Sequence, residues 1–566
     1  MSDGTDRTPY EIGLTMAGAA SAGAYAAGVV DFLIEALDQW HQAKEERPDE
    51  VPNHEVRLKV MSGSSAGGMT GAIAAGLLSG SHTPITTLPG KEPAESVWRA
   101  NPLYSAWVEQ IDIRPLLGHA DLSSPNNQVV SLLDSSVLSR IAETAIDFTP
   151  RDEPRDYVAD PLHLFLTITN LKGVPYDITF ESSQDVPHRT FRHTDYKEFA
   201  LSRAMPDGED ARRLAPSDPR DSGWNALRQY ALATGAFPGG LAPRALSRPR
   251  ADYDDRRWTV PPAAGEEDGT RRSIEPSWPE GTRDDEYRFL AVDGGAMNNE
   301  PFRLARRKLA GTEGSLEGTP KQATRSVLMV DPLPSDPIAG MEGLQDRSLP
   351  AVLTGLFDSL IEQTRFKPDE LALAHSEEDY SRYMIVPTRR DQNEEKVSHP
   401  IASEMLGGFG GFLKKRFRMH DFQLGRRNCQ QFLRKYYGIP RPDCSNNPVF
   451  AHYDAADLDK FIDKFGVKRD GTGVMPIIPL VGDVASEEFP LRWKTLEMTD
   501  RELKELKARI DDRTGRVLDR MVDRYVDGWA WSGIAQFAAG SLAQGRIVDG
   551  ILSKVEASLE EYDLKT

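Results

Sequence analysis

The first eighty residues repeat one pattern of apolar and polar positions. An apolar run at 11–16 (EIGLTM) precedes a segment of small residues, after which apolar residues recur at helical spacing from Tyr25 to Leu37. A second run at 56–61 (VRLKVM) precedes SGSSAGG and the apolar stretch MTGAIAAGLL. Two consecutive strand–turn–helix units predict a parallel α/β sheet.

Further apolar runs extend this sheet, and the segments between them are less regular. Residues 80–125 are rich in Pro, Ser and Trp, which favours loops and short helices, and we expect a lid there. The charged, Pro-rich segments 204–222 and 244–286 predict surface loops. The remaining strands are expected at 164–170, 176–180, 287–292, 326–330 and 383–387.

The composition is typical of a globular protein of a reducing compartment. The chain has 566 residues, of which 39% are hydrophobic and 27% are charged, so it can bury a full core without disulfides. Its two cysteines argue against a disulfide framework and against a multi-cysteine zinc site. Because its first residues are polar and acidic, they do not resemble a secretory signal. We therefore expect a cytoplasmic protein.

The charge balance bears on possible partners. The 68 basic residues are outnumbered by 87 acidic ones, for a net charge of −19, which argues against a general nucleic-acid binder. The segment 414–427 is a local exception, with six basic residues and only Asp421 against them. It predicts either an anchor for anionic lipid headgroups or, as we favour, a solvated helix face or internal ion pairs. Trp529 and Trp531 predict either an interfacial helix or, as we favour, a core helix, so peripheral membrane contact stays open.

The turn after the second strand carries the sharpest chemical signal. The segment 63–67 (GSSAG) fits the pattern G-x-S-x-G with Ser65 at its centre, between an apolar strand and an apolar helix. A nucleophilic serine occupies such a turn because flanking glycines let neighbouring elements pass closely and the helix N-terminus offers free N–H groups. The same five residues also occur in ordinary Ser/Gly-rich turns, but their position here favours a nucleophile.

A serine nucleophile needs a base and a place for the oxyanion. Asp293 ends an apolar run and precedes two glycines, so we expect it at the carboxyl edge of the sheet, where Ser65 is also expected. An aspartate that merely caps a turn would fit the same letters equally well. His420 follows both residues in chain order, as in a Ser–His–Asp triad, although a structural histidine is the more usual interpretation.

Together these segments resemble the patatin-like phospholipase family. The resemblance covers roughly residues 9–335, and Asn299 and Pro301 belong to its last motif. Four segments match in the order of the family: the glycine-rich loop GAASAGAYAAGVV at 18–30, GSSAG at 63–67, TGAFPGGLAP at 234–243 and DGGAMNNEP at 293–301.

The resemblance implies a fold, an activity and a set of site residues. The implied fold is α/β, with three layers (α/β/α) around a mostly parallel central sheet. The implied activity is hydrolysis of the acyl esters of phospholipids or related lipids by a dyad of Ser65 and Asp293, without histidine or metal. The implied oxyanion hole lies at Gly18, Ala19 and Ala20, and the motif glycines are Gly63, Gly67, Gly294 and Gly295.

The glycine-rich loop departs from the pattern of the family, which has three glycines, any residue, a basic residue and a glycine. Here Ala19 and Ala20 replace glycines and Ala22 replaces the basic residue. Alanine keeps its N–H group but reaches positive φ less readily, so another loop conformation is conceivable. Loss of an oxyanion donor typically lowers turnover by about 100- to 1,000-fold. The alternative function is therefore a catalytically silent lipid-binding or scaffold protein.

The chain divides, by its pattern, into two expected parts. Residues 9–400 form the expected catalytic domain, which contains the motifs and the lid. Residues 401–566 read as a largely helical C-terminal extension, for which the sequence indicates no role. The oligomeric state, the acyl position cleaved and any activating partner are not indicated.

Overall fold

The computed structural model describes most of the chain. Trp529 and Trp531 lie outside the described residues, so the two interpretations of that segment are not tested. Within 259, 522–525 and 533–543 only the backbone is described. The described residues are 7–86, 92–123, 128–179, 187–205, 211–254, 256–259, 273–278, 285–311, 316–333, 379–391, 393–525 and 533–565.

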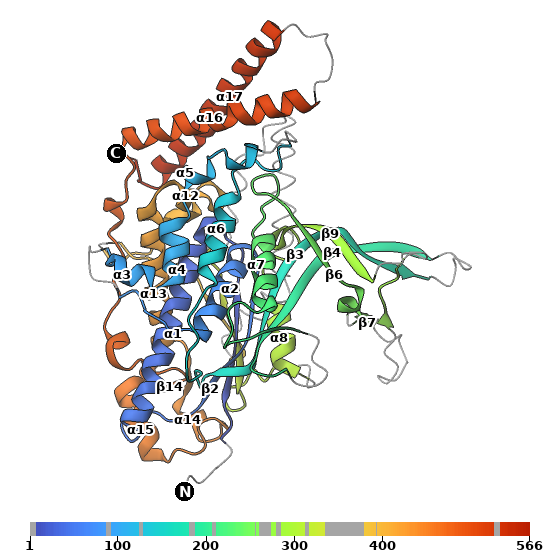
Figure 1. Ribbon diagram of the computed structural model, residues 1–566. Coiled ribbons are helices and arrows are strands. Elements are labelled where there is room, and N and C mark those ends of the chain that lie inside the picture. Colours follow the sequence, from blue (N-terminus) through green and yellow to red (C-terminus); the bar gives the residue numbers. More distant parts are fainter. Residues whose placement is uncertain are drawn as a thin grey trace.

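A central sheet organises the molecule, in the order β11-β10-β1-β2-β3-β4-β5 (Figure 1). The pairs from β11 to β3 are parallel, whereas β4 and β9 run antiparallel to β3. The strands are β1 (Tyr10–Met16), β2 (Val56–Gly63), β3 (Val158–Ile178), β4 (His188–Leu201), β5 (Arg212–Leu214), β6 (Arg244–Pro249), β9 (Glu286–Asp293), β10 (Arg325–Val330) and β11 (Arg382–Ile385).

The sheet is covered by helices on both faces, which confirms the three-layer α/β/α fold. Alternate residues of β10 separate the faces: Leu328 and Val330 join the large core under α1 (Gly23–Glu46), α2 (Ser65–Ser79) and α7 (Ser222–Thr234). Val327 and Met329 join a smaller core with α8 (Phe302–Ala310). Strands buried on both faces in this way read as continuous apolar runs, which is why they were visible in the sequence.

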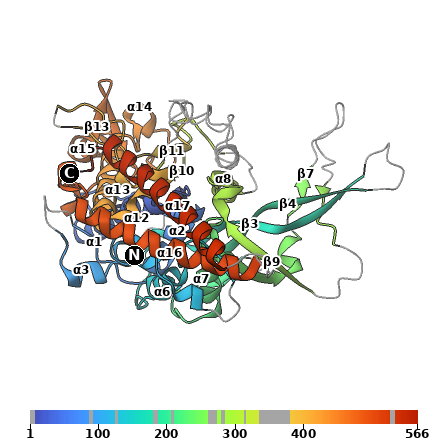
Figure 2. The ribbon, with the colours of Figure 1, turned by 90° about the horizontal axis from the view of Figure 1, so that it is seen from above.

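Three expectations about strands were wrong in detail. The expected strand 164–170 and residues 176–178 of the expected strand 176–180 are parts of β3, which continues through a register shift against β4, whereas residue 180 lies outside the described residues. β4 itself was not predicted, because its sequence HRTFRHTDYKEFAL is polar and only four of its fourteen residues are buried. Of the expected surface loops, 204–222 contains β5, and 244–286 contains β6, β7 (Trp258–Thr259) and β8 (Ser273–Ile274). β5 and β6 belong to the central sheet, whereas β7 and β8 pair with each other in a separate two-stranded sheet. The far ends of β3, β4, β6 and β9 form an arm beside which β7 lies (Figures 1 and 2).

The C-terminal region is largely helical and continues the helical layer. Helix α13 (Lys415–Lys435) lies along α1, and their backbones touch at two glycines: a Cβ on Gly28 would lie 1.9 Å from Phe422 O, and one on Gly425 would lie 2.1 Å from Tyr25 O. The expected boundary at residue 400 thus falls within one continuous hydrophobic core.

Smaller elements complete this region. A hairpin of two long helices lies at the top of Figure 1. The elements are α11 (Met405–Gly408), α12 (Gly410–Leu413), α14 (Arg441–Cys444), α15 (Ala455–Phe465), α16 (Asp500–Tyr525), α17 (Gly533–Glu561) and a small sheet of β12 (Gly438–Pro440), β13 (Val467–Arg469) and β14 (Thr472–Pro476).

The basic segment 414–427 is mostly occupied by ion pairs within the protein. Arg426 is fully buried and pairs with Asp31, with Glu35 and with Glu488. Arg418, also fully buried, contacts Asp112 at 3.1 Å, Lys414 pairs with Glu502 at 3.0 Å, and Lys415 with Glu109 at 2.6 Å. This agrees with the internal ion pairs that we favoured over a lipid anchor.

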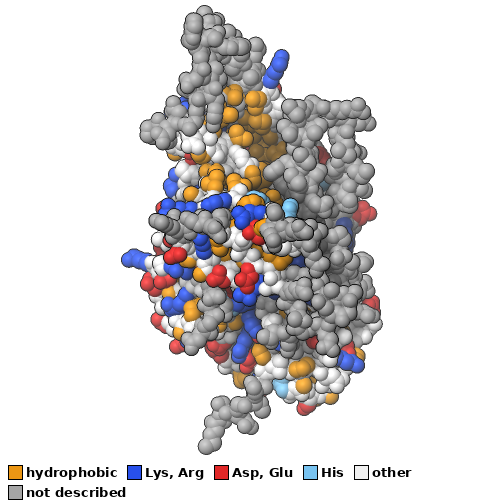
Figure 3. Space-filling view, turned by 90° about the vertical axis from the view of Figure 1, so that its right-hand side faces the viewer, with side chains coloured by type: hydrophobic (Ala, Val, Ile, Leu, Met, Phe, Trp, Pro, Cys, Tyr) orange, Lys and Arg blue, Asp and Glu red, His pale blue; other side chains and the backbone are white. Residues whose placement is uncertain are grey.

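Helix Ala20–Glu46 is long and apolar enough to cross a membrane by length and composition alone, but 94% of its most apolar window is buried inside the fold. It therefore behaves as a core helix here. The face seen in Figure 3 carries a gathering of hydrophobic side chains in its upper part and interspersed acidic and basic side chains lower down.

Candidate active site

Ser65 lies at the first position of α2, on a strained turn. Its φ of +49° belongs to the left-handed region that side chains other than glycine rarely adopt. The turn is tight because β1 passes directly beneath it: a Cβ on Gly67 would lie 2.3 Å from Met16 O. A Cβ on Gly63 would lie 2.5 Å from Gly67 O. Both motif glycines are thus required for the backbone to close around Ser65.

The Ser65 hydroxyl donates a hydrogen bond to Asp293 Oδ2 at 2.6 Å. As expected from the sequence, both residues follow the carboxyl ends of their strands and lie together, but the two strands are not parallel neighbours, because β9 is antiparallel to β3. β2 and β9 instead meet end to end beside β3, because Gly63 pairs with Leu166 and Asp293 with Ile168. The ends of two opposed strands therefore bring Ser65 and Asp293 together.

Asp293 lies in an environment that keeps its carboxyl group partly protonated. The residue is 4% exposed, and burial raises the pKa of its carboxyl to about 7. Hydrogen bonds from Ser65 and from the Gly295 N–H, the latter at 2.7 Å, lower this pKa by less than burial raises it. Gly294 packs against Thr167 so closely that a Cβ would lie 2.3 Å from its Oγ1. A carboxylate with a pKa near 7 is suited to general-base work at neutral pH.

The glycine-rich loop lies across from this pair. Gly18 donates its N–H to Asn299 O at 3.2 Å, so that donor is already used. The N–H groups of Ala19 and Ala20 form no hydrogen bond with any residue that the structure describes, and both residues line the same pocket as Ser65. Ala20 has φ +42°, so the loop keeps a left-handed residue although alanine replaces glycine. The strain is local, and the donors remain available.

Three further residues hold this geometry. Thr234 accepts the Ser65 N–H on its hydroxyl oxygen at 2.8 Å, and Thr169 donates its hydroxyl to Asp293 O at 2.7 Å. Asn299 donates to Gly18 O at 3.3 Å, and a Cβ on Gly18 would lie 2.2 Å from Asn299 Oδ1. The loop and the Asp293 turn are therefore locked to each other. Thr234 and Asn299 belong to the matched motifs, but only the structure shows what they contact.

The C-terminal region contributes a second support for the loop, which sequence reasoning missed. Ser21 is fully buried; it donates its hydroxyl to Gly408 O at 2.5 Å and accepts the Gly411 N–H at 2.9 Å. The segment Leu406–Gly408 has positive φ at all three residues. The run of glycines at 407–411 is the sequence signal that could have indicated so tight an approach.

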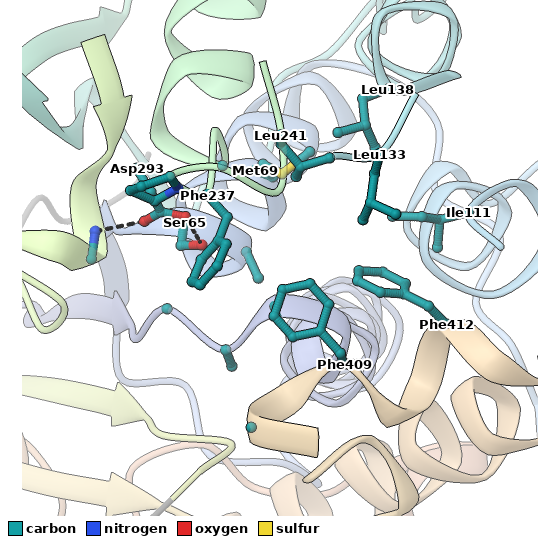
Figure 4. A pocket seen from close by; sticks show the side chains of 18 of the residues that line it. Ser65, Met69, Ile111, Leu133, Leu138, Phe237, Leu241, Asp293, Phe409 and Phe412 are labelled. Carbon is teal, nitrogen blue, oxygen red and sulfur yellow. Dashed lines mark hydrogen bonds between the residues drawn. The ribbon is translucent and has the colours of Figure 1, made fainter. Parts of the chain in front are cut away.

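A mostly apolar pocket of about 140 Å³ opens beside Ser65 (Figure 4). Phe237 stacks edge-on against Phe409, and Phe409 against Phe412, along one side of it. Trp107 and Ile111, from the expected lid, line another part. Phe409 and Phe412, which follow the turn at 406–408, line this pocket, and Phe412 is at the same time part of the large hydrophobic core.

His420 does not take part in the site. It is fully buried, its Nδ1 lies 2.8 Å from Asp421 Oδ1, and its ring packs edge-on against Trp493. Neither His420 nor any other histidine is among the described residues that line the pocket. The structural interpretation of His420 is the better supported one. Among the residues that the structure describes, there is also no group of three His, Cys, Asp or Glu side chains that could hold a metal ion.

Comparisons with known proteins agree with the motifs. The uncharacterized protein y4iI of Sinorhizobium fredii (strain NBRC 101917 / NGR234) is 35% identical over 564 residues, which cover 92% of this chain and 77% of that protein. The crystal structure of VipD from Legionella pneumophila aligns with 98% of this chain and 87% of its own at 12% identity, but the TM-score of 0.22 is too low to carry an argument. The model of the patatin-like phospholipase family matches residues 14–306. This chain therefore belongs to the patatin-like phospholipase family.

Proposed function

We propose that the protein is a serine acylhydrolase that cleaves fatty acyl esters of phospholipids or related lipids. The observation that carries this proposal is the 2.6 Å hydrogen bond from Ser65 Oγ to the buried Asp293 carboxylate at one end of an apolar pocket. Lipid acyl hydrolysis is the activity of the family as a whole. The apolar walls favour an acyl chain over a polar substrate.

The acylation step follows from the hydrogen-bond pattern. The Asp293 carboxylate takes the hydroxyl proton as Ser65 Oγ attacks the ester carbonyl carbon. The resulting oxyanion accepts hydrogen bonds from the N–H groups of Ala19 and Ala20, which the locked loop already orients and which have no partner among the described residues. Collapse of the tetrahedral intermediate breaks the ester C–O bond, the leaving alcohol takes the proton from Asp293, and the acyl group stays on Ser65.

Deacylation uses the same groups in the same order. Asp293 removes a proton from a water molecule that attacks the acyl-enzyme carbonyl. The second tetrahedral intermediate is held by the same N–H groups and collapses with release of the fatty acid. The proton returns from Asp293 to Ser65 Oγ, so the enzyme ends in its starting state.

Covalent labelling by a fluorophosphonate probe tests the proposal, because such probes react with activated serines. We expect labelling of the wild type, none of Ser65→Ala, and a large decrease for Asp293→Asn. Ser64→Ala is the matched control: Ser64 is adjacent and buried, and its hydroxyl forms no hydrogen bond with the described residues, so this variant should be labelled. A folded wild type that resists the probe would contradict the proposal and favour the silent lipid-binding protein.

A further inference from the structure

A second, smaller cavity of about 30 Å³ lies behind the pocket that contains Ser65. All of the residues that line it are apolar. It shares four lining residues with the outer pocket, namely Met69, Trp107, Ile111 and Leu138, so the two cavities meet at these side chains. Figure 4 shows Met69, Ile111 and Leu138 around the side of the pocket away from Asp293. The two cavities are thus adjacent, with the four shared side chains between them, and together they mark out one apolar path from Ser65.

The path follows one face of α2. Ser65 and Met69 line the outer pocket, and Met69 and Ile73 line the inner cavity. Residues four apart lie on the same side of a helix, and eight residues at the helical rise correspond to about 12 Å. That distance is roughly the length of an extended chain of ten carbons.

The path ends one helical turn beyond Ile73. A Cβ on Gly76 would lie 3.5 Å from Phe148 Cδ1 and 3.9 Å from the Ile146 Cα, so these residues close over α2 at that point. Ile146 also lines the inner cavity and is 2% exposed. Helix α6 (Ser136–Ala145) forms another wall of the inner cavity, where the short side chains of Ala142 and Ala145 leave the cavity open.

We propose that the inner cavity receives the methyl end of a single acyl chain and limits that chain to about eight to twelve carbons. This rests on the function proposed above. The volumes agree with the length along α2. If each methylene-sized group takes about 10–15 Å³, the inner cavity of about 30 Å³ holds two or three such groups. The outer pocket of about 140 Å³ holds about ten, and the ester group itself occupies some of these positions.

Hydrolysis of p-nitrophenyl esters of increasing chain length, from about four to about sixteen carbons, tests the inference. For the wild type we expect kcat/KM to peak at about eight to twelve carbons and to fall about tenfold or more beyond the peak. Ala142→Leu fills the inner cavity and should move the peak to shorter chains. Ile146→Ala opens its end and should move the peak to longer chains. Glu143→Leu, an exposed neighbour on the same helix, is the matched control and should leave the profile unchanged.

The outcomes separate the two proposals. If no ester of any length is hydrolysed by a folded wild type, the proposed function fails. If esters are hydrolysed in a Ser65-dependent manner but the peak lies at sixteen carbons, or stays in place in both cavity variants, the inference about the inner cavity is overturned. Opposite shifts in Ala142→Leu and Ile146→Ala, each shown to be folded by its thermal unfolding, would support it.

Discussion

At the scale of single residues, the burial of Asp293 has consequences for both activity and stability. The carboxyl group must be ionised to accept the Ser65 proton, but burial raises its pKa to about 7. The hydroxyl of Ser65 and the N–H of Gly295 are the two groups that hydrogen-bond to this carboxylate among the described residues. In the proposed mechanism, the carboxyl group that serves as the base is therefore about half-ionised near pH 7.

The first prediction concerns the pH dependence of activity. Below about pH 7 Asp293 is protonated and cannot act as a base, so kcat/KM should rise through about pH 7 and then level off. The measurement is the rate of ester hydrolysis and of probe labelling from about pH 5 to about pH 9, with the free energy of unfolding measured in parallel to show that the fold persists. A midpoint near the ordinary aspartate pKa of about 4 would contradict this prediction.

The second prediction concerns stability. The Asp293 carboxyl releases its proton near pH 4 in the unfolded protein and near pH 7 in the folded protein. The free energy of unfolding should therefore fall as pH rises between these two values. Three pKa units correspond to roughly 4 kcal/mol, which is the order of magnitude of the full penalty. Asp293→Asn should therefore be more stable than the wild type at about pH 8, with a smaller difference at about pH 5. Denaturant unfolding at both values measures this, and an equal effect at both would refute it.

The third prediction concerns the strain at Ala20. Its φ of +42° favours glycine, so relief of strain in Ala20→Gly should raise the free energy of unfolding by about 1 kcal/mol. The greater conformational entropy that glycine gives the unfolded chain offsets part of this gain. The N–H group is retained, so labelling of Ser65 should not fall. Ala24→Gly is the control: Ala24 is buried within α1, where glycine should be destabilising by about 1 kcal/mol. The same sign for both variants would contradict the argument.

At the scale of elements, the loop that precedes α1 depends on a segment almost four hundred residues away. Ser21 bonds to both Gly408 and Gly411, and Arg418 of α13 in turn donates to Gly411 O at 2.7 Å. The loop with the open N–H groups is thus held from two sides, by Asn299 and by the C-terminal region. This gives the turn at 406–413 a structural role that its sequence does not reveal.

The fourth prediction tests that role. Ser21→Ala leaves a buried carbonyl and a buried N–H without partners, so the free energy of unfolding should fall by about 1–3 kcal/mol in total. The variant should also lower kcat more than it raises KM, because the proposed oxyanion donors lose their support. Ser403→Ala is a matched control: the Ser403 hydroxyl also lies beside Gly411 but forms no hydrogen bond with the described residues. The measurement is kcat and KM of both variants in steady-state kinetics. An equal loss of kcat in both would rule out a positioning role for Ser21.

At the scale of the whole molecule, the part that carries the family motifs and the C-terminal region share one core. Helix α13 lies along α1 with their backbones in contact at Gly28 and Gly425. Arg426 places a buried charge between α1 and the C-terminal region, paired with Asp31, Glu35 and Glu488. Removal of one partner from such a buried cluster is strongly destabilising, so the two parts are expected to unfold together.

The fifth prediction is that unfolding is cooperative across the expected boundary at residue 400. Gly28→Val would force α1 and α13 apart, because a Cβ there would lie 1.9 Å from Phe422 O, so we expect a loss of more than about 4 kcal/mol. Gly550→Val in α17 is the control, because a Cβ at that position meets no atom within 4 Å among the described residues. Calorimetry should show one transition for the wild type. Two separable transitions, of which Gly28→Val affects only one, would contradict the prediction.

Much of the fold and of the site was predictable because local features carry the information. Strands β1, β2 and β10 were visible as apolar runs because most of their residues are buried, and β9 was visible by its alternation and its apolar end. The turns at Ser65 and Asp293 were visible because only certain residues fit them. β4 was missed because its polar residues acquire strand structure by pairing along β3.

The sequence by itself determined the family, the order of the α/β units and the residue types that the proposed chemistry needs. These follow from periodicity and turn chemistry, which involve neighbours along the chain. Only the tertiary structure decided that β2 and β9 meet end to end, that Ser21 is held by Gly408 and Gly411, and that Phe409 faces the pocket. Such contacts join residues hundreds of positions apart, and they are set by the packing of whole elements, which no local pattern records.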